Sequence, residues 1–159
     1  MKIAVLGGNG YLGGRVAAGL AGSFDTTIIT RRPYLLNGCK NIVVDFSSVL
    51  LETLIDFDVI INFVGANRST TKLDPVGSIG IKQNISECLS KLSKINKIFV
   101  LQASSKHIYS SVTRENEHIH ENNKDHYALG HLTSEEYLRD NFSFDNGSTY
   151  QIMRLSNFF

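Results

Sequence analysis

The first fifteen residues constrain the fold more than any other stretch of this chain. They read MKIAVLGGNGYLGGR, an apolar run from Lys2 to Leu6 that leads directly into glycines at positions 7, 10 and 13. A short apolar run of this kind is typical of a strand buried on both faces. Apolar residues then keep a helical spacing from Leu12 to Leu20. The pattern predicts a strand, a glycine-rich turn and a helix, in that order.

Each of the three glycines meets a different steric demand. Gly7 allows the chain to turn sharply, Gly10 allows the backbone to approach a diphosphate, and Gly13 allows the helix to pack close to the strand. The N–H groups and the dipole at the start of a helix both favour an anion. The segment therefore predicts a dinucleotide site, and a tight turn that needs glycine without a ligand is the alternative.

Composition narrows the classes of partner. The chain has 159 residues, of which 42% are hydrophobic, and its net charge is +1. This length suits a single domain, and the small charge gives no field that would attract nucleic acid or an anionic membrane, so we expect a small-molecule partner. No apolar run approaches the roughly 20 residues of a membrane span, and no signal-peptide pattern precedes the first strand.

Cysteine and histidine usage adds two expectations. Cys39 and Cys88 form no CxxC pair, which favours a cytoplasmic location. Only His118 and His120 are closely spaced among the histidines, and cysteine ligands are absent, so no metal site is expected.

Strand and helix patterns alternate along the rest of the chain. Strands are expected at residues 26–30, 41–46, 58–64, 97–103 and 149–154, and helices near 49–55, 75–95 and 127–140. This alternation predicts one doubly wound α/β domain over residues 1–159, with a parallel six-stranded sheet ordered 3-2-1-4-5-6 and helices on both faces. The polar stretch 113–125 is expected to be a mobile loop over the carboxyl edge of the sheet. The long helix around 76–95 either covers the sheet or also presents a face to a second copy in a homodimer.

The end of the second predicted strand bears on the choice of cofactor. In a doubly wound sheet this position lies beside the adenosine ribose, where an acidic residue suits NAD and an arginine suits the 2′-phosphate of NADP. Arg31 and Arg32 stand there, which predicts NADP, with NAD as the second possibility. The alternative is that these arginines belong to a solvated loop before Pro33.

Three hydroxyl-bearing residues near the carboxyl edge suggest a reaction. The fifth strand delivers Ser104 and Ser105 to this edge, and Tyr127 begins the helix that follows the polar stretch. A tyrosinate can take the proton of an alcohol as hydride leaves carbon, while a serine hydroxyl holds the developing oxyanion. The combination predicts carbonyl–alcohol redox chemistry.

With these residues in place, the chain resembles the extended branch of the short-chain dehydrogenase/reductase superfamily, the Rossmann-fold nucleotide-sugar epimerases, dehydratases and reductases. The matching segments, in the family's order, are GGNGYLG at 7–13, Asp45, NFVGA at 62–66, Asn84 in IKQNISECL, ASSKHIYS at 103–110, Tyr127 with Glu135 in YALGHLTSEEYL, and RLSNFF at 154–159.

The resemblance implies a role for each matching position. Ser105, four residues before Tyr109, would orient the substrate and Tyr127 would be the general acid/base. With Arg31 and Arg32, the predicted cofactor contacts are Gly7, Asn9, Gly10, Tyr11, Leu12, Gly13, Asp45, Phe46, Val64, Gly65, Ala66 and Asn84. The substrate implied is a nucleotide sugar, and the resemblance leaves the reaction open among epimerisation, dehydration and reduction.

Two departures from the family pattern leave a second function open. The family's Y-x-x-x-K reads Tyr127-Ala-Leu-Gly-His131, and the family lysine binds the nicotinamide ribose and favours the ionised tyrosine. His131 either takes over part of that role in catalysis or marks a catalytically silent dinucleotide-binding module used for regulation or assembly. The family also continues beyond RLSN, so the chain is expected to lack the C-terminal substrate-binding region.

Overall fold

The computed structural model describes residues 1–48, 51–65, 67–109 and 125–156. It contains a six-stranded parallel sheet with strand order β3-β2-β1-β4-β5-β6, which confirms the predicted doubly wound topology. The strands are β1 (Lys2–Leu6), β2 (Asp25–Thr30), β3 (Lys40–Val43), β4 (Val59–Asn62), β5 (Phe99–Ser105) and β6 (Thr149–Leu155). The helices are α1 (Tyr11–Leu20), α2 (Leu51–Leu54), α3 (Arg68–Leu73), α4 (Pro75–Ile95) and α5 (His126–Asn141), with the 3-10 turn η1 (Lys106–Ile108).

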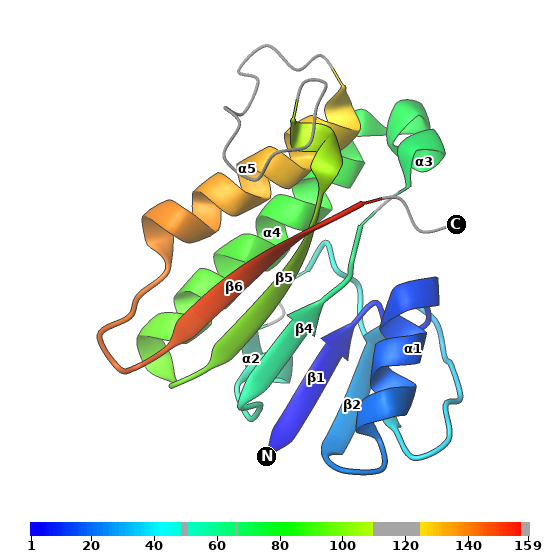
Figure 1. The fold of residues 1–159 in the computed structure, drawn as a ribbon, viewed down its shortest axis with the longest axis vertical. Coiled ribbons are helices and arrows are strands. Elements are labelled where there is room, and N and C mark those ends of the chain that lie inside the picture. Colours follow the sequence, from blue (N-terminus) through cyan, green and yellow to red (C-terminus); the bar gives the residue numbers. More distant parts are fainter. Residues whose placement is uncertain (49–50, 66, 110–124, 157–159) are drawn as a thin grey trace.

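Helices cover both faces of the sheet (Figure 1). The α1 helix packs on one face, where Ala17 joins Ile3, Val5 and Ile28 in a buried cluster. The α2, α4 and α5 helices lie on the other face, over a larger cluster that includes Leu89 of α4 and other fully buried side chains. This division follows from right-handed crossovers, because the chain moves in opposite directions along the sheet after β1 and after β4.

The ends of several elements differ from the sequence prediction. The third strand was predicted to reach Phe46 but ends at Val43, although the Val44 N–H still donates a hydrogen bond to the Thr30 carbonyl. The fifth strand runs two residues further than predicted, because Ser104 and Ser105 pair with Arg154 and Leu155 of β6. Both serines therefore sit within a strand end.

One helix has no counterpart in the prediction. The polar stretch before Pro75 forms α3, whose N-cap is Asn67 with its side-chain oxygen accepting from the Thr70 N–H at 2.8 Å. Thr71 is the only buried residue of this helix, so α3 has no apolar stripe that the sequence could reveal. The mobile loop predicted at 113–125 lies outside the described residues except for Asp125, which is the N-cap of α5.

Gly13 offers a direct test of the close packing in this fold. A Cβ at position 13 would lie 2.4 Å from the Gly7 carbonyl oxygen, a backbone atom that cannot rotate away. We expect Gly13→Ala to destabilise the protein by about 1–3 kcal/mol, the usual cost of overpacking. Chemical denaturation monitored by circular dichroism measures this change.

The matched control for Gly13 is Gly19 in the same helix. A Cβ at position 19 meets no described atom within 4 Å, so Gly19→Ala should stabilise the protein by up to about 1 kcal/mol through helix propensity. Equal effects of the two substitutions would contradict the close-approach explanation.

Candidate functional site

The glycine turn creates an open helix end at the carboxyl edge of the sheet. Gly7 adopts φ +76°, a conformation that favours glycine, and a Cβ there would lie 3.2 Å from the Phe63 carbonyl carbon. Gly10 is the N-cap of α1 and places no side chain over the first N–H groups of the helix. These groups can therefore donate to an anion, as expected for a pyrophosphate site.

Two cavities open around this turn and adjoin each other, because both are lined by Gly7, Gly10, Val64 and Gly65, and they are together called the cleft. The smaller, about 360 Å³, contains Arg31 and is called the Arg31 cavity. The larger, about 700 Å³, contains Tyr127 and is called the Tyr127 cavity. Together they extend from the end of β2 to the start of α5, which suits an elongated ligand.

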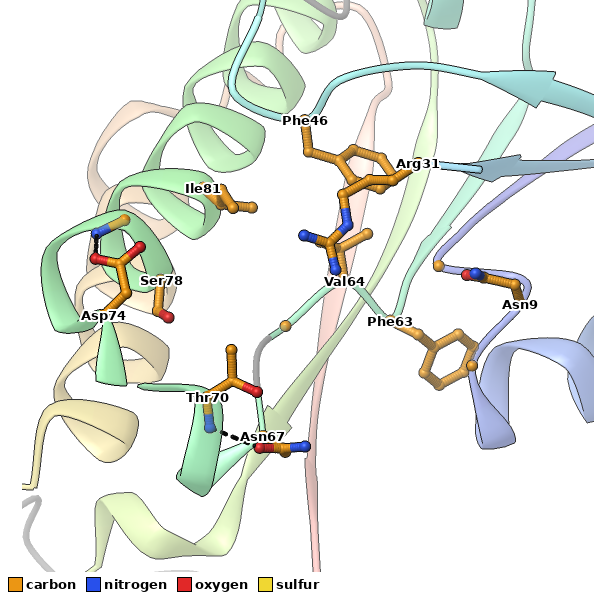
Figure 2. A pocket seen from close by; sticks show the side chains of 14 residues that line it. Asn9, Arg31, Phe46, Phe63, Val64, Asn67, Thr70, Asp74, Ser78 and Ile81 are labelled. Carbon is orange, nitrogen blue, oxygen red and sulfur yellow. Dashed lines mark hydrogen bonds between the residues drawn. The ribbon is translucent and has the colours of Figure 1, made fainter. Parts of the chain in front are cut away.

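The Arg31 cavity contains several of the predicted cofactor residues. Asn9, Arg31 and Phe46 line it, and the Arg31 side chain points into the cavity beside Phe46 and Val64 (Figure 2). Arg32 is exposed and lines neither cavity, although its carbonyl accepts a hydrogen bond from the Thr30 hydroxyl. The structure thus distinguishes two arginines that the sequence treats alike.

Two other predicted positions do not belong to the cavity lining. The Asp45 carboxylate accepts hydrogen bonds from the N–H and the hydroxyl of Ser47, and these bonds lower its pKa. The Asn84 amide donates to the carbonyls of Phe46 and Ser48 at 2.8 and 2.7 Å. Asn84 therefore fixes the loop that carries Phe46, and neither Asp45 nor Asn84 lines the described cavities.

Sequence reasoning missed the part of the Arg31 cavity supplied by α3 and the start of α4. Asn67, Thr70, Asp74 and Ser78 line this side, facing the glycine turn across the cavity (Figure 2). Asn67 and Asp74 are both helix N-caps. The signal that could have revealed them is an asparagine before the short polar helix α3 and an aspartate directly before the proline that begins the long helix α4.

The Tyr127 cavity brings together all three predicted catalytic residues. Ser105, Tyr127 and His131 line it, along with Ser104. The predicted cofactor residues Tyr11, Leu12 and Gly13 line the same cavity, whereas Ala66 lies outside the described residues. Residues from β5, α5 and the glycine turn thus converge, as predicted from the carboxyl ends of parallel strands.

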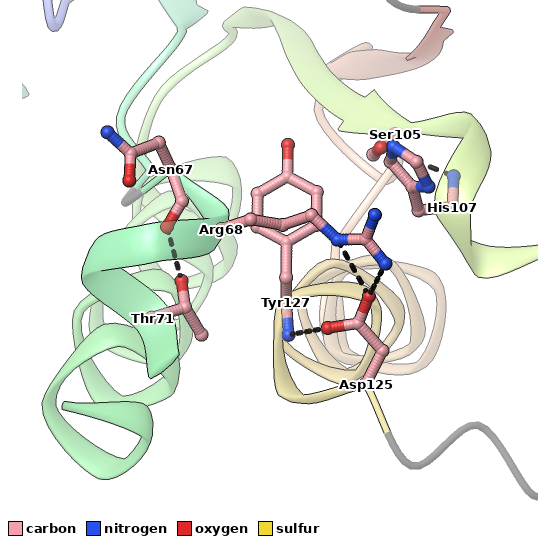
Figure 3. Close-up of polar contacts among 7 residues, drawn as sticks. All are labelled: Asn67, Arg68, Thr71, Ser105, His107, Asp125 and Tyr127. Carbon is pink, nitrogen blue, oxygen red and sulfur yellow. Dashed lines mark hydrogen bonds and ion pairs between the residues drawn. The ribbon is translucent and has the colours of Figure 1, made fainter. Parts of the chain in front are cut away.

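Tyr127 projects from the first turn of α5 between α3 and the end of β5 (Figure 3). Its N–H donates to the carboxylate of Asp125, the N-cap residue, at 3.1 Å, and Arg68 of α3 forms an ion pair with the same carboxylate. This pair, with the hydrogen bond of the Arg68 Nε at 3.0 Å, also lowers the pKa of Asp125 against the opposing effect of burial. The position of Tyr127 therefore depends on a link between α3 and α5.

Two serine hydroxyls lie across the cavity from the start of α5. Ser105 is buried, and its hydroxyl oxygen accepts from the His107 N–H at 3.2 Å. Ser104 is also buried, and its hydroxyl has no hydrogen-bond partner among the described residues. A buried hydroxyl in this state gains free energy when a ligand supplies a partner, so Ser104 is a candidate ligand contact in addition to Ser105.

His131 lies one helical turn after Tyr127, and the two rings meet edge-on with centroids 4.8 Å apart. Lys82 of α4 places its Nζ 3.0 Å from the His131 Nε2 and 3.3 Å from the Nδ1. Burial, followed by the charges of Lys82 and His107, lowers the pKa of His131 to about 3. The imidazole is therefore neutral at pH 7 and supplies no positive charge beside Tyr127.

Arg154, the first residue of the matching segment RLSNFF, makes contacts that stabilise the fold. Arg154 of β6 forms a bidentate ion pair with the buried Glu135 of α5, with Nη2 2.7 Å from Oε2. It also donates to the Tyr109 hydroxyl, and these contacts raise the pKa of Arg154. Arg154 thereby ties β6, α5 and the segment after η1 together beside the cleft.

Candidate metal-binding clusters and membrane-spanning helices are both absent from the described part of the chain. The described residues contain no group of three or more side chains that could hold a metal ion. Within the same part of the chain, no helix has the length and apolarity required to span a bilayer.

Similar architectures occur in solved structures of about twice this length. The chain aligns with UDP-N-acetylglucosamine 4-epimerase from Methanobrevibacter ruminantium M1 in complex with UDP-N-acetylmuramic acid, at 22% identity, TM-score 0.78, and coverage of 96% of this chain and 54% of that one. It aligns with UDP-glucose 4-epimerase with UDP-glucose from Thermotoga maritima at 16% identity, TM-score 0.80, and coverage of 97% and 55%. It aligns with MoeE5 in complex with UDP-glucuronic acid and NAD at 17% identity, TM-score 0.80, and coverage of 97% and 54%. At these identities the likeness establishes the fold.

The sequence comparison identifies the family. A search of curated proteins finds no match, whereas the profile of the NAD dependent epimerase/dehydratase family matches residues 3–159. That match spans nearly the whole chain and agrees with the glycine turn, the strand order and the Tyr127 cavity. The chain belongs to the NAD dependent epimerase/dehydratase family.

Proposed function

We propose that this chain binds a nicotinamide dinucleotide along the cleft and uses it in redox chemistry on a nucleotide sugar. The observation that carries the proposal is the convergence of Ser105, Tyr127 and the glycine turn on one cavity of about 700 Å³. The solved relatives with UDP-sugars and NAD support the choice of ligand class. The chain spans about half their length, so the substrate and the activity are proposals drawn from the site.

Two parts of the cleft suit the phosphate groups of the cofactor. The N–H groups at the start of α1 suit the pyrophosphate, and Arg31 suits a 2′-phosphate on the adenosine ribose. When bound, the nicotinamide supplies hydride transfer to or from carbon. Tyr127 then exchanges the proton of the reacting hydroxyl, and the Ser105 hydroxyl donates to the same oxygen as charge develops.

A second candidate function is a silent dinucleotide-binding module for regulation or assembly. The neutral state of His131 favours it, because the position that carries a lysine in the family supplies no charge here. The two candidates agree on cofactor binding and differ only in turnover. A homodimer through α4 remains a separate prediction.

Substitution of Tyr127 separates the two candidates. Tyr127→Phe removes the proton-exchanging hydroxyl, so turnover should fall about a hundredfold or more while dinucleotide affinity stays nearly unchanged. Turnover is followed with a panel of UDP-sugars, by the absorbance of the reduced nicotinamide for net oxidation or reduction and by chromatography of the sugar product for epimerisation or dehydration, which leave the cofactor unchanged. Affinity is measured by calorimetry. Tyr137→Phe, on the same helix but away from both cavities, is the control and should leave turnover unchanged. Cofactor binding without turnover on any sugar would favour the silent module.

The two arginines after β2 allow a matched test of cofactor choice. Arg31→Ala should weaken NADP binding relative to NAD about ten- to a hundredfold, because a hydrogen bond to a charged group contributes roughly 1.5–3 kcal/mol. Arg32→Ala is the control, since that side chain lies outside the cavity. Calorimetry with both dinucleotides measures the ratio, and an unchanged ratio in Arg31→Ala would contradict the NADP preference.

A further inference from the structure

Lys82 is a buried cation that the proposed chemistry does not use. Its side chain is only 4% exposed, and none of the ion pairs among the described residues includes it. Burying an ammonium group without a carboxylate is unfavourable, so the amine loses its proton more readily than in water. Burial accordingly lowers the pKa of Lys82 to about 7.

The Lys82 side chain occupies space that is open because two of its neighbours are glycines. A Cβ at Gly130 of α5 would lie 3.3 Å from the Lys82 Cδ, beside the stem of the side chain. A Cβ at Gly65 would lie 2.9 Å from the Nζ, beside its charged end. Gly65 lines both cavities, so the Lys82 amine lies directly behind the wall of the cleft.

The amine also faces Tyr127 and His131. The Nζ lies 5.8 Å from the centroid of the Tyr127 ring and 3.0 Å from the nearer ring nitrogen of His131. The charge of His107, in η1, also lowers the pKa of His131. Of the neighbouring acids, Glu135 is engaged by Arg154 and Asp125 by Arg68. The pKa of Lys82 therefore lies near neutrality in a cluster that also contains His107.

We propose that protonation of Lys82 sets the charge behind the Tyr127 cavity, so that the preference between oxidised and reduced dinucleotide depends on pH. The inference rests on the proposed function, because it assumes that the nicotinamide occupies this cavity. The oxidised ring carries a positive charge and the reduced ring does not. An ammonium behind the wall therefore disfavours the oxidised form, and the neutral amine does not. Lys82 acts here as a positioning residue, not as one that touches the substrate.

The affinity ratio of the two cofactor forms tests the proposal without turnover. We expect the wild-type preference for the reduced form to weaken about tenfold as the pH rises from about 6 to about 8, since two unit charges several ångströms apart in a partly buried site interact on this scale. Calorimetry with NAD⁺, NADH, NADP⁺ and NADPH measures it. Lys82→Met should abolish the pH dependence, whereas Lys91→Met, an exposed lysine of the same helix paired with Glu87, should retain it.

Moving the lysine provides a rescue experiment. His131→Lys alone places a second amine beside Lys82, and the two amines repel each other when both are charged. In the double variant Lys82→Met/His131→Lys, one amine is restored on α5, and the pH dependence of the affinity ratio should return. A merely structural role of Lys82 would not produce this recovery.

Two further measurements act on the protein without cofactor. Labelled-lysine NMR should show Lys82 titrating near pH 7, and a midpoint near that of an exposed lysine, about 10.4, would contradict the proposal. Because the folded pKa lies below the usual 10.5, the unfolded chain binds more protons between these values, and stability rises with pH across this interval. Lys82→Met should therefore fold and should melt at a higher temperature than wild type below pH 7, with the gap closing at higher pH.

The outcomes separate the inference from the function on which it rests. Binding of both cofactor forms with a ratio that is independent of pH, or with the same pH dependence in Lys82→Met, contradicts the inference alone. Failure of the folded protein to bind any of the four forms contradicts the proposed function and the inference with it.

Discussion

The site depends on one constraint in the sheet. The strands β1 and β4 are neighbours, and the chain leaves their carboxyl ends toward opposite faces of the sheet. After β1 the chain turns into α1 on one face, and after β4 it passes into α3 and α4 on the other. The cleft is the space between these departing chains. Glycine is favoured at position 7 because the turn holds it at φ +76°, where a side chain would be strained, and because a Cβ there would lie only 3.2 Å from the Phe63 carbonyl carbon. The open helix end at Gly10 then faces the same space.

A second constraint, the close packing of α4 on α5, places the chemistry at the far end of that cleft. The two helices approach through small residues, and the Ser86 and Ser134 hydroxyls lie 2.6 Å apart. One turn earlier, Lys82 meets His131 across the same interface. Tyr127 lies a further turn along α5, where the interface ends and the cavity begins. Interhelical packing thus fixes where the titratable groups sit relative to the cleft.

The sequence predicted the frame of the molecule better than its polar detail. Strand order and the convergence of Ser105 and Tyr127 follow from alternating apolar segments, because the carboxyl ends of parallel strands share one edge. The sequence did not predict the α3 helix, because this helix is stabilised by its caps and a single buried threonine and has no apolar stripe. The sequence did not reveal Lys82, because the apolar residues of α4, among them Ile85, Leu89 and Leu92, mark only the face that packs in the core. A second series on that helix, Lys82, Ser86 and Ser93 at steps of four and seven, marked the face that α5 covers.

Two cations, Arg154 and Lys82, lie partly or fully buried beside the cleft, and their surroundings shift their pKa values in opposite directions. Arg154 receives a bidentate carboxylate from Glu135, which offsets its desolvation and keeps it charged at all accessible pH values. Lys82 receives an imidazole that burial itself keeps neutral, and so its charge is free to change near pH 7. A fixed charge suits a structural tie among β6, α5 and Tyr109, whereas a variable charge suits a site whose ligand changes charge during its reaction. Lys82 lies behind Gly65, which lines both cavities, and its position connects the packing of α4 and α5 to the electrostatics of the cleft.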